Sequence, residues 1–192
     1  MNNPEEKILF TGKSRKGRSL VFRYPLESDV EDMWRYINAL SKEKTFIHLQ
    51  GEEVTLDEEK RFVTSQIEKI KEHKAVLLPA FSDQKLVGIS GIELNGNTEK
   101  HIGILGISVA KEFRGEGIGS LLLKHVIELA IDHIKGLEII SLQVFSHNTL
   151  GRDMYKRYGF KEYAYLPKGV KLENSYHDQI LMYKNVNKHI PT

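Results

Sequence analysis

The sequence contains no cysteine among its 192 residues. Disulfide bonds, thiolate metal ligands and a cysteine nucleophile are therefore all excluded. A chain without cysteine suits a reducing compartment, so we expect a cytoplasmic protein, although the absence of cysteine is not confined to that compartment.

Long apolar runs and a large net charge are missing as well. The longest nearly apolar stretch, Ile102–Ala110, is far shorter than the roughly 20 residues that cross a bilayer. The segment Met1–Glu6 is polar and acidic, so we expect no signal peptide. The formal net charge is only +2, which favours neither nucleic acid nor a membrane surface as a partner.

What is present is the composition of a globular protein, with 40% apolar and 28% charged residues. A chain of this length predicts a single domain over residues 1–192, with a core at about 20–184 and an N-terminal extension or hairpin at 1–19. A solvated loop is the simplest interpretation of the basic residues in this extension, and a phosphate-contacting patch is the alternative. These residues are Lys13, Arg15, Lys16 and Arg18.

Two helices are predicted in the first third of the chain. Ser28–Glu31 and Thr55–Glu58 both match the capping box, in which a hydroxyl residue is followed three positions later by Glu. Phe46–Val54 between them is predicted to be a loop. Apolar residues at helical spacing follow each box: Val30, Met33, Trp34, Ile37 and Leu40 in the first helix, and Phe62, Val63, Gln66, Ile67 and Ile70 in the second.

The remainder alternates between strand and helix patterns, which predicts a mixed α/β fold. His101–Val109 is rich in Ile and nearly apolar, as expected of a buried central strand. The other predicted strands are Ala75–Phe81, Lys85–Leu94, Leu137–Phe145, Phe160–Tyr165 and Gln179–Tyr183, and the predicted helices are Ile118–Ile134 and Asn148–Tyr158.

A glycine-rich loop lies between a predicted strand and a predicted helix. Glycine alternates in the run Gly115-x-Gly117-x-Gly119, directly after Arg114. Glycine lets backbone N–H groups approach an anion closely and tolerates the backbone angles of a tight loop. The helix that follows adds unpaired N–H groups and the positive end of its dipole. Together these features predict an anion site.

Glycine motifs of this kind have three other interpretations. A purely structural turn stays open as the alternative to an anion site. A dinucleotide-binding loop needs G-x-G-x-x-G, but Ser120 stands where its last glycine should be. A P-loop needs G-x-x-x-x-G-K-[ST], and the run Gly12-Lys13-Ser14 fails because Lys7 stands at the first glycine position.

Two separate segments resemble the GNAT superfamily of acetyl-CoA-dependent N-acetyltransferases. Arg114, Gly117 and Gly119 fit its cofactor-loop signature [RQ]-x-x-G-x-[GA]. Downstream, 148–160 is similar to the family pattern N-x-x-A-x-x-L-Y-x-x-x-G-F. The matching residues are Asn148, Tyr155, Gly159 and Phe160, while Gly151 replaces the usual Ala and Met154 the usual Leu. The likeness extends over about 20–184.

The resemblance implies a mixed, mostly antiparallel central sheet flanked by helices and splayed between its fourth and fifth core strands, here His101–Val109 and Leu137–Phe145. It implies acetyl-CoA as acetyl donor, with its pantetheine arm in the splay and its pyrophosphate on the glycine loop. The implied cofactor-binding residues are Ile107, Ser108, Val109, Arg114, Gly115, Glu116, Gly117, Ile118, Gly119, Ser120, Asn148 and Tyr155.

The resemblance also implies the catalytic groups. Tyr155 would protonate the leaving thiolate, and the main-chain N–H of Val109 is a candidate oxyanion donor. Without cysteine, the amine would attack directly in a ternary complex. A primary amine has a pKa of roughly 10, so a base is needed. The sequence leaves three candidates open: His101, Glu93 and a water relay.

The sequence thus predicts an N-acetyltransferase that uses no metal and acts on a small-molecule or peptide amine. The alternative is a catalytically silent acyl-CoA-binding or sensor module of the same fold. A nucleic-acid binder is disfavoured by the low net charge. Dimers are common in the family that the sequence resembles, so a homodimer is one state to expect.

Overall fold

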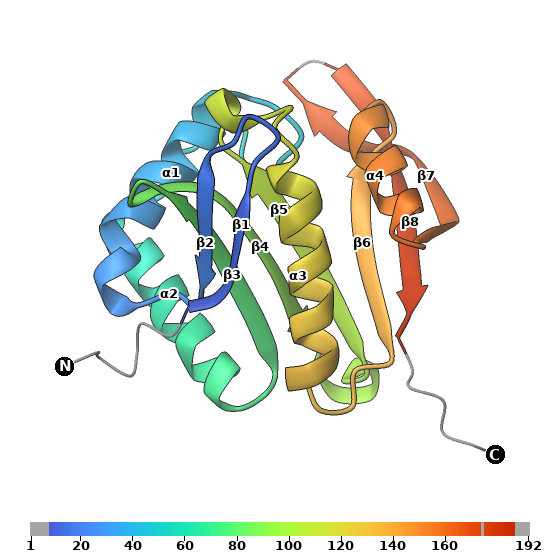
Figure 1. The fold of residues 1–192 in the computed structure, drawn as a ribbon. Helices are drawn as coiled ribbons and strands as arrows, with labels where there is room; N and C mark the ends of the chain where they lie inside the picture. Colours follow the sequence, from blue (N-terminus) through green and yellow to red (C-terminus); the bar gives the residue numbers. More distant parts are fainter. Residues whose placement is uncertain (1–7, 174, 187–192) are drawn as a thin grey trace. The chain divides into compact units, whose positions relative to one another are not determined.

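A mixed α/β architecture is seen in the computed structural model, which describes residues 8–173 and 175–186 (Figure 1). The N-terminal segment Met1–Glu6 and the rest of residues 1–7 of the predicted extension lie outside the described residues. In the described part, the strands form one mostly antiparallel, eight-stranded sheet in the order β1-β2-β3-β4-β5-β6-β8-β7. The strands are β1 (Ile8–Lys13), β2 (Ser19–Arg23), β3 (Ala75–Ser82), β4 (Lys85–Leu94), β5 (Ile102–Val109), β6 (Ile139–Phe145), β7 (Lys161–Leu172) and β8 (Ser175–Asn185).

Four α-helices accompany the sheet in the same residues: α1 (Val30–Lys42), α2 (Leu56–Lys71), α3 (Ile118–His133) and α4 (Thr149–Arg157). The predicted mixed, mostly antiparallel sheet flanked by helices is confirmed. None of these helices has the length and apolar character that crossing a membrane requires.

The chain divides into two compact units. Unit 1 consists of Met1–Ile92 and Gly106–Lys135, and unit 2 consists of Glu93–Leu105 and Gly136–Thr192. Strand β5 contributes its first half to unit 2 and its second half to unit 1. The single domain over residues 1–192 stays a prediction.

The core of unit 1 lies where α1 and α2 pack against β3 and β4. Each buried apolar side chain contributes roughly 1.5–3 kcal/mol to the free energy of folding, relative to the same side chain left exposed. A further close approach involves Gly88 in β4, where an added Cβ would lie 2.8 Å from Leu122 of α3. The absence of a side chain at Gly88 therefore lets α3 pack tightly on the sheet. The core cluster is Met33, Tyr36, Leu40, Val63, Leu77, Phe81 and Leu86.

The predicted N-terminal hairpin is confirmed. β1 and β2 pair antiparallel, with Thr11 opposite Val21. The hairpin packs on α3, because the Phe10 ring stacks on His125 with 4.1 Å between ring centroids. Figure 1 shows its turn beside the first turn of α3. The hairpin thus brings the start of the chain to the glycine loop.

One of the two capping boxes forms. The Thr55 main-chain N–H donates to the Glu58 carboxylate at 2.8 Å, and the Glu58 N–H donates to the Thr55 hydroxyl at 3.3 Å. The predicted box at Ser28 is wrong, because a 3₁₀ turn (Glu27–Asp29) precedes α1. There the Asp29 carboxylate accepts the Leu26 N–H at 2.8 Å instead.

Unit 2 is built on β6, which pairs antiparallel with β8, while β8 pairs antiparallel with β7. The predicted strands Phe160–Tyr165 and Gln179–Tyr183 are too short, since β7 and β8 are 12 and 11 residues long. The register of this pair shifts between Leu166 and Val170. Pro167 lies within that irregularity, at the sheet edge, where proline is tolerated.

The parallel pair β5–β6 fits the predicted splay. Its register runs from Ile102 opposite Ile139 to Ile104 opposite Ser141, whereas β5 continues to Val109 and β6 to Phe145. The predicted full burial of β5 is wrong, because Ile104 is 43% exposed while Leu105 is buried. Alternating burial is typical of a strand with one covered face.

A buried carboxyl group occupies the first turn of α2. Glu59 is only 6% exposed, and burial raises its pKa to about 7. The unfolded chain therefore releases this proton at lower pH than the folded protein does. The folded protein binds more protons between about pH 4.5 and pH 7, so Glu59 lowers the stability progressively as the pH rises through that range.

We expect the substitution Glu59→Gln to flatten this part of the stability profile. The gain in the free energy of unfolding relative to the parent protein should grow from near zero at pH 5 to roughly 1–2 kcal/mol at pH 8, allowing for solvent screening. Urea unfolding at both pH values measures it. Glu68→Gln, on the exposed side of the same helix, is the control. An equal effect of Glu59→Gln at both pH values would contradict the prediction.

Candidate functional site

The glycine loop of unit 1 has the backbone shape that its sequence suggested. After β5, a 3₁₀ turn (Lys111–Phe113) leads to Gly115 and Gly117, whose φ angles are +77° and +84°. Gly117 is the N-cap of α3 and its carbonyl accepts the N–H of Ser120 at 3.1 Å. Side chains rarely adopt these angles, so glycine is required at both positions.

The loop has the features of an anion site. The start of α3, at Ile118 and Gly119, presents main-chain N–H groups and the positive end of the helix dipole, while the Ser120 N–H already donates to the Gly117 carbonyl. A Cβ added at Gly115 would meet nothing within 4 Å. This side of the loop is therefore open, as the approach of a ligand would require.

Glu116, between the two glycines, points away from any open side. Its carboxylate is fully buried and accepts the Ser14 hydroxyl at 2.9 Å and Arg18 Nε at 3.1 Å. Lys16 Nζ lies 3.3 Å from the same carboxylate. The Glu116 side chain therefore clamps the turn of the β1–β2 hairpin to the glycine loop. The predicted contact of Glu116 with the cofactor stays a prediction, and it could involve only the main chain of this residue.

The charge state of Glu116 follows from this environment. Burial by itself raises the pKa of the carboxyl, but the hydrogen bonds from Ser14 and Lys16 and the charge of Arg18 outweigh burial and lower the pKa below its ordinary value. The carboxylate is consequently ionised at neutral pH and holds the basic turn by charge as well as by hydrogen bonds.

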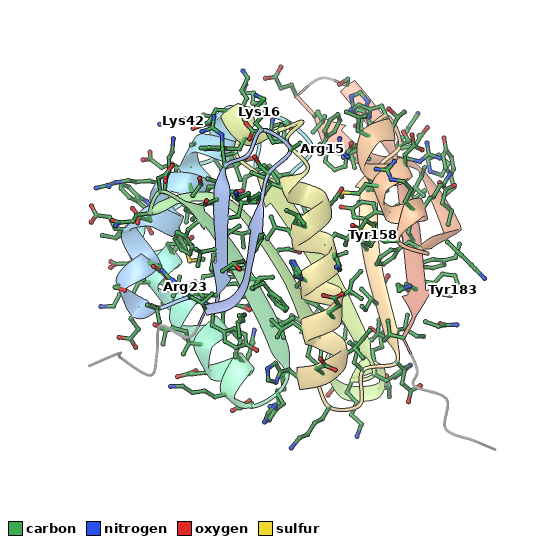
Figure 2. All side chains as sticks on the ribbon, in the orientation of Figure 1. Arg15, Lys16, Arg23, Lys42, Tyr158 and Tyr183 are labelled. Atoms are coloured by element: carbon green, nitrogen blue, oxygen red, sulfur yellow. The ribbon has the colours of Figure 1, made fainter. Side chains whose placement is uncertain are left out.

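The hairpin turn also brings Arg15 to the loop. The Arg15 main-chain N–H donates to the Glu116 carbonyl at 2.8 Å. Its side chain crosses Gly117, because an added Cβ there would lie 3.2 Å from Arg15 Nε. Figure 2 shows Arg15 and Lys16 at this turn. The sequence offered the basic patch only as an alternative, since nothing local indicates that it meets the glycine loop.

Arg114, the predicted pyrophosphate ligand, is held by its own neighbours. Its Nε donates to the Val109 carbonyl at 2.9 Å, and its Nη2 lies 2.6 Å from Glu43 Oε2. Guanidinium has five N–H donors in total, so these contacts orient the group without exhausting its capacity. Arg114 thereby ties the end of β5 to the end of α1.

A second contact joins α1 to β5. The Tyr36 hydroxyl lies 2.9 Å from the hydroxyl of Ser108. Ser108 is the residue of β5 between Ile107 and Val109. Burial raises the pKa of Tyr36 above its ordinary value, so the phenol stays protonated. The apolar residues predicted at helical spacing included Ile37, which is partly buried, but not Tyr36, which the i, i+3 spacing from Met33 would have indicated.

Unit 2 contains the other predicted residues. Tyr155 on α4 is 8% exposed, and its ring meets the Phe160 ring edge-on at 5.9 Å. Burial raises the pKa of Tyr155 to about 12. The hydroxyl therefore carries its proton throughout the neutral range.

Asn148 begins the helix that carries Tyr155. Its side-chain oxygen accepts the Gly151 N–H at 3.0 Å, which caps α4. A Cβ at Gly151 would lie 2.8 Å from Asn148 Nδ2. The exchange of the family's Ala for Gly151 is thus matched to the position of Asn148 in this chain.

The two candidate bases also belong to unit 2. His101 lies in the turn before β5 rather than in the strand, and its carbonyl accepts the N–H groups of Glu138 at 2.9 Å and Ile139 at 3.2 Å. Glu93 is half-buried near the end of β4. Within the described residues, no group of three or more His, Asp and Glu side chains is arranged to hold a metal ion.

The chain matches a protein-family model over most of its length. The model of the acetyltransferase (GNAT) family matches residues 34–160, a span that contains the glycine loop and the whole downstream motif 148–160. Both motifs on which the resemblance rested therefore lie in the matched region.

Two curated relatives are similar over parts of the chain. N-alpha-acetyltransferase 60 of Danio rerio is 43% identical over 68 residues, which are 33% of this chain and 27% of the relative. Thialysine N-epsilon-acetyltransferase of Bos taurus is 41% identical over 56 residues, 29% of this chain and 32% of the relative. The chain thus matches between about a quarter and a third of the length of these relatives.

Solved structures match over nearly the whole fold. A GNAT-family acetyltransferase from Streptococcus pneumoniae superposes with a TM-score of 0.80 at 28% identity, covering 87% of this chain and 99% of that protein. Two more distant structures, both 15% identical with TM-scores of 0.77 and 0.75, share the fold and were solved with acetyl-CoA and coenzyme A.

The clamp at Glu116 has a measurable consequence. In the variant Glu116→Gln, the side chain keeps its size but loses the charge that holds Lys16 and Arg18. We expect the melting temperature to fall by several degrees, because Lys16 and Arg18 then lie beside a neutral amide and lose the negative charge that they pair with. Glu112→Gln, at an exposed ion pair with Lys85, is the control and should change little. Equal melting temperatures for the two variants would contradict the clamp.

Proposed function

The chain belongs to the acetyltransferase (GNAT) family, and from this we propose that it transfers the acetyl group of acetyl-CoA to a primary amine. The observation that carries the proposal is the glycine loop, with Gly115 and Gly117 in the left-handed region and the helix N-terminus behind them. Family membership makes the protein an acyltransferase, and the open loop fits the pyrophosphate of the donor.

The residues of unit 1 would bind the donor. Main-chain N–H groups from Gly115 to Ser120 would hold its pyrophosphate, and main chain at Ile107, Ser108 and Val109 would bond its pantetheine arm. Arg114 would add charge beside the loop while it orients the end of β5 through Val109. When bound, acetyl-CoA supplies an acetyl group as a thioester, which an amine nitrogen attacks.

Tyr155 would act as the general acid. The amine nitrogen forms a bond to the carbonyl carbon, the carbon–sulfur bond breaks, and the tyrosine proton goes to the sulfur. A pKa of about 12 makes Tyr155 a weaker acid than a thiol, whose pKa is roughly 8.5. Transfer of this proton to a free thiolate is uphill, so it would occur only as the carbon–sulfur bond breaks and charge grows on sulfur, and the tyrosinate left behind would regain a proton from water. Asn148 would contact the cofactor's arm while it caps the helix of Tyr155.

The acceptor amine is protonated at neutral pH, with a pKa of roughly 10, and must lose this proton before its nitrogen can attack. His101, Glu93 and a water relay remain the three candidates for this base. Val109, through its main-chain N–H, would stabilise the developing oxyanion. The acceptor is proposed only as a class, a primary amine on a small molecule or a peptide, because the two relatives carry names for Nα- and Nε-acetylation. A homodimer is likewise retained as a proposal.

Calorimetric titration with acetyl-CoA, followed by an assay of free CoA release on an amine panel, tests the function. The panel contains an N-terminal peptide, lysine analogues and polyamines. Saturable binding with turnover on any of them establishes the proposal and names the acceptor class. Binding without turnover favours the catalytically silent acyl-CoA module of the same fold. An absence of binding would overturn the assignment of the glycine loop.

The substitution Tyr155→Phe separates catalysis from binding. It removes the proton donor but leaves the buried ring against Phe160. We expect kcat to fall by roughly 10²-fold or more, while the Kd for acetyl-CoA changes little, because the buried ring keeps its place against Phe160. Tyr158→Phe, the same substitution at the C-cap of α4, is the control. A variant that keeps the parent kcat would refute the general-acid role.

A further inference from the structure

The turn of the N-terminal hairpin is an additional part of the nucleotide-binding surface, and we propose that the Arg15 guanidinium binds a phosphate group of the cofactor's 3′-phosphorylated ADP end. The inference rests on the proposed function, since acyl-CoA is the ligand. It goes beyond the glycine loop, because Arg15 belongs to β1–β2, about a hundred residues earlier in the chain.

The turn is held in one conformation before any ligand arrives. The Ser14 hydroxyl accepts the N–H groups of Lys16 at 3.2 Å and Arg18 at 3.3 Å. The Gly17 N–H donates to the Ser14 carbonyl at 2.9 Å, and Gly17 has a φ of +82°. Ser14 in turn donates to the buried Glu116 carboxylate. Because the turn is preorganised, little conformational freedom is lost when its side chains bind a ligand.

Arg15 is the member of the turn whose charge is available. Lys16 and Arg18 both pair with Glu116, whereas no acidic partner of the Arg15 guanidinium is found in residues 8–173 and 175–186. The three cations face a single carboxylate, which leaves an excess of two positive charges at this turn. An exposed guanidinium beside a helix N-terminus suits an anion better than any neutral group.

The position of Arg15 selects phosphate as the ligand chemistry. Its side chain runs across Gly117, the N-cap of α3, at 3.2–3.5 Å from the position of an added Cβ. The loop's N–H groups and the guanidinium therefore converge on the same region from two sides. Guanidinium binds phosphate oxygens through two parallel N–H donors, which lysine does not reproduce.

The test compares Arg15→Gln with the parent protein by calorimetric titration of acetyl-CoA and of its 3′-dephospho analogue. Glutamine keeps the main-chain N–H that donates to Glu116, so the clamp survives the change. We expect acetyl-CoA to bind roughly 5- to 30-fold more weakly to the variant. If only acetyl-CoA binds more weakly to the variant, Arg15 contacts the 3′-phosphate. If both ligands lose affinity equally, Arg15 contacts the pyrophosphate.

Arg61→Gln, with the same change of charge on the exposed side of α2, is the matched control and should bind like the parent. Raising the salt concentration should weaken acetyl-CoA binding by the parent more than by Arg15→Gln, since salt screens the arginine–phosphate attraction that only the parent has. Unchanged affinity in a variant that melts like the parent would overturn the role of Arg15. If the parent itself fails to bind acetyl-CoA, the proposed function fails first, and the two failures are thereby distinguished.

Discussion

The buried carboxylate of Glu116 is the interaction on which the arrangement of the glycine loop depends. It lies between two glycines with positive φ and accepts hydrogen bonds from Ser14 and Arg18, far away in the sequence. A charge inside a protein is tolerable only when it is paired and hydrogen-bonded. The same residue that occupies the variable position of the loop motif thus joins the loop to the N-terminal hairpin, and the loop is supported from a side that its own sequence does not supply.

Burial divides the polar groups of this protein into two kinds. Burial raises the pKa values of the Tyr36 and Tyr155 hydroxyls, so both remain protonated. Glu116 lies among cations that lower its pKa and keep it ionised, and Arg114 is held in position by its ion pair with Glu43. Proton donors and anchoring charges are consequently distributed by environment, and each kind suits a different part of an acyl-transfer reaction.

The downstream motif shows the same dependence on local contacts. The place of Gly151 beside the Asn148 cap accounts for a departure from the family pattern that the sequence alone presents as a mismatch. The extended β7–β8 pair similarly continues through Pro167, where the sequence pattern ended a strand. At Gly151 the Asn148 side chain leaves no room for a Cβ, and at Pro167 the sheet edge tolerates a residue that cannot donate a backbone hydrogen bond.

Local signals in the sequence were sufficient for the strand-loop-helix around Arg114–Ser120, the Thr55 capping box and the mixed α/β class. Each depends on residues within one turn or one strand, so it is visible without the fold. Only the tertiary structure decided that Arg15 meets Gly117, that Glu116 is buried under the hairpin and that Glu43 pairs with Arg114. These contacts join segments distant in the chain, and their energies depend on burial and on relative position, which a one-dimensional pattern does not contain.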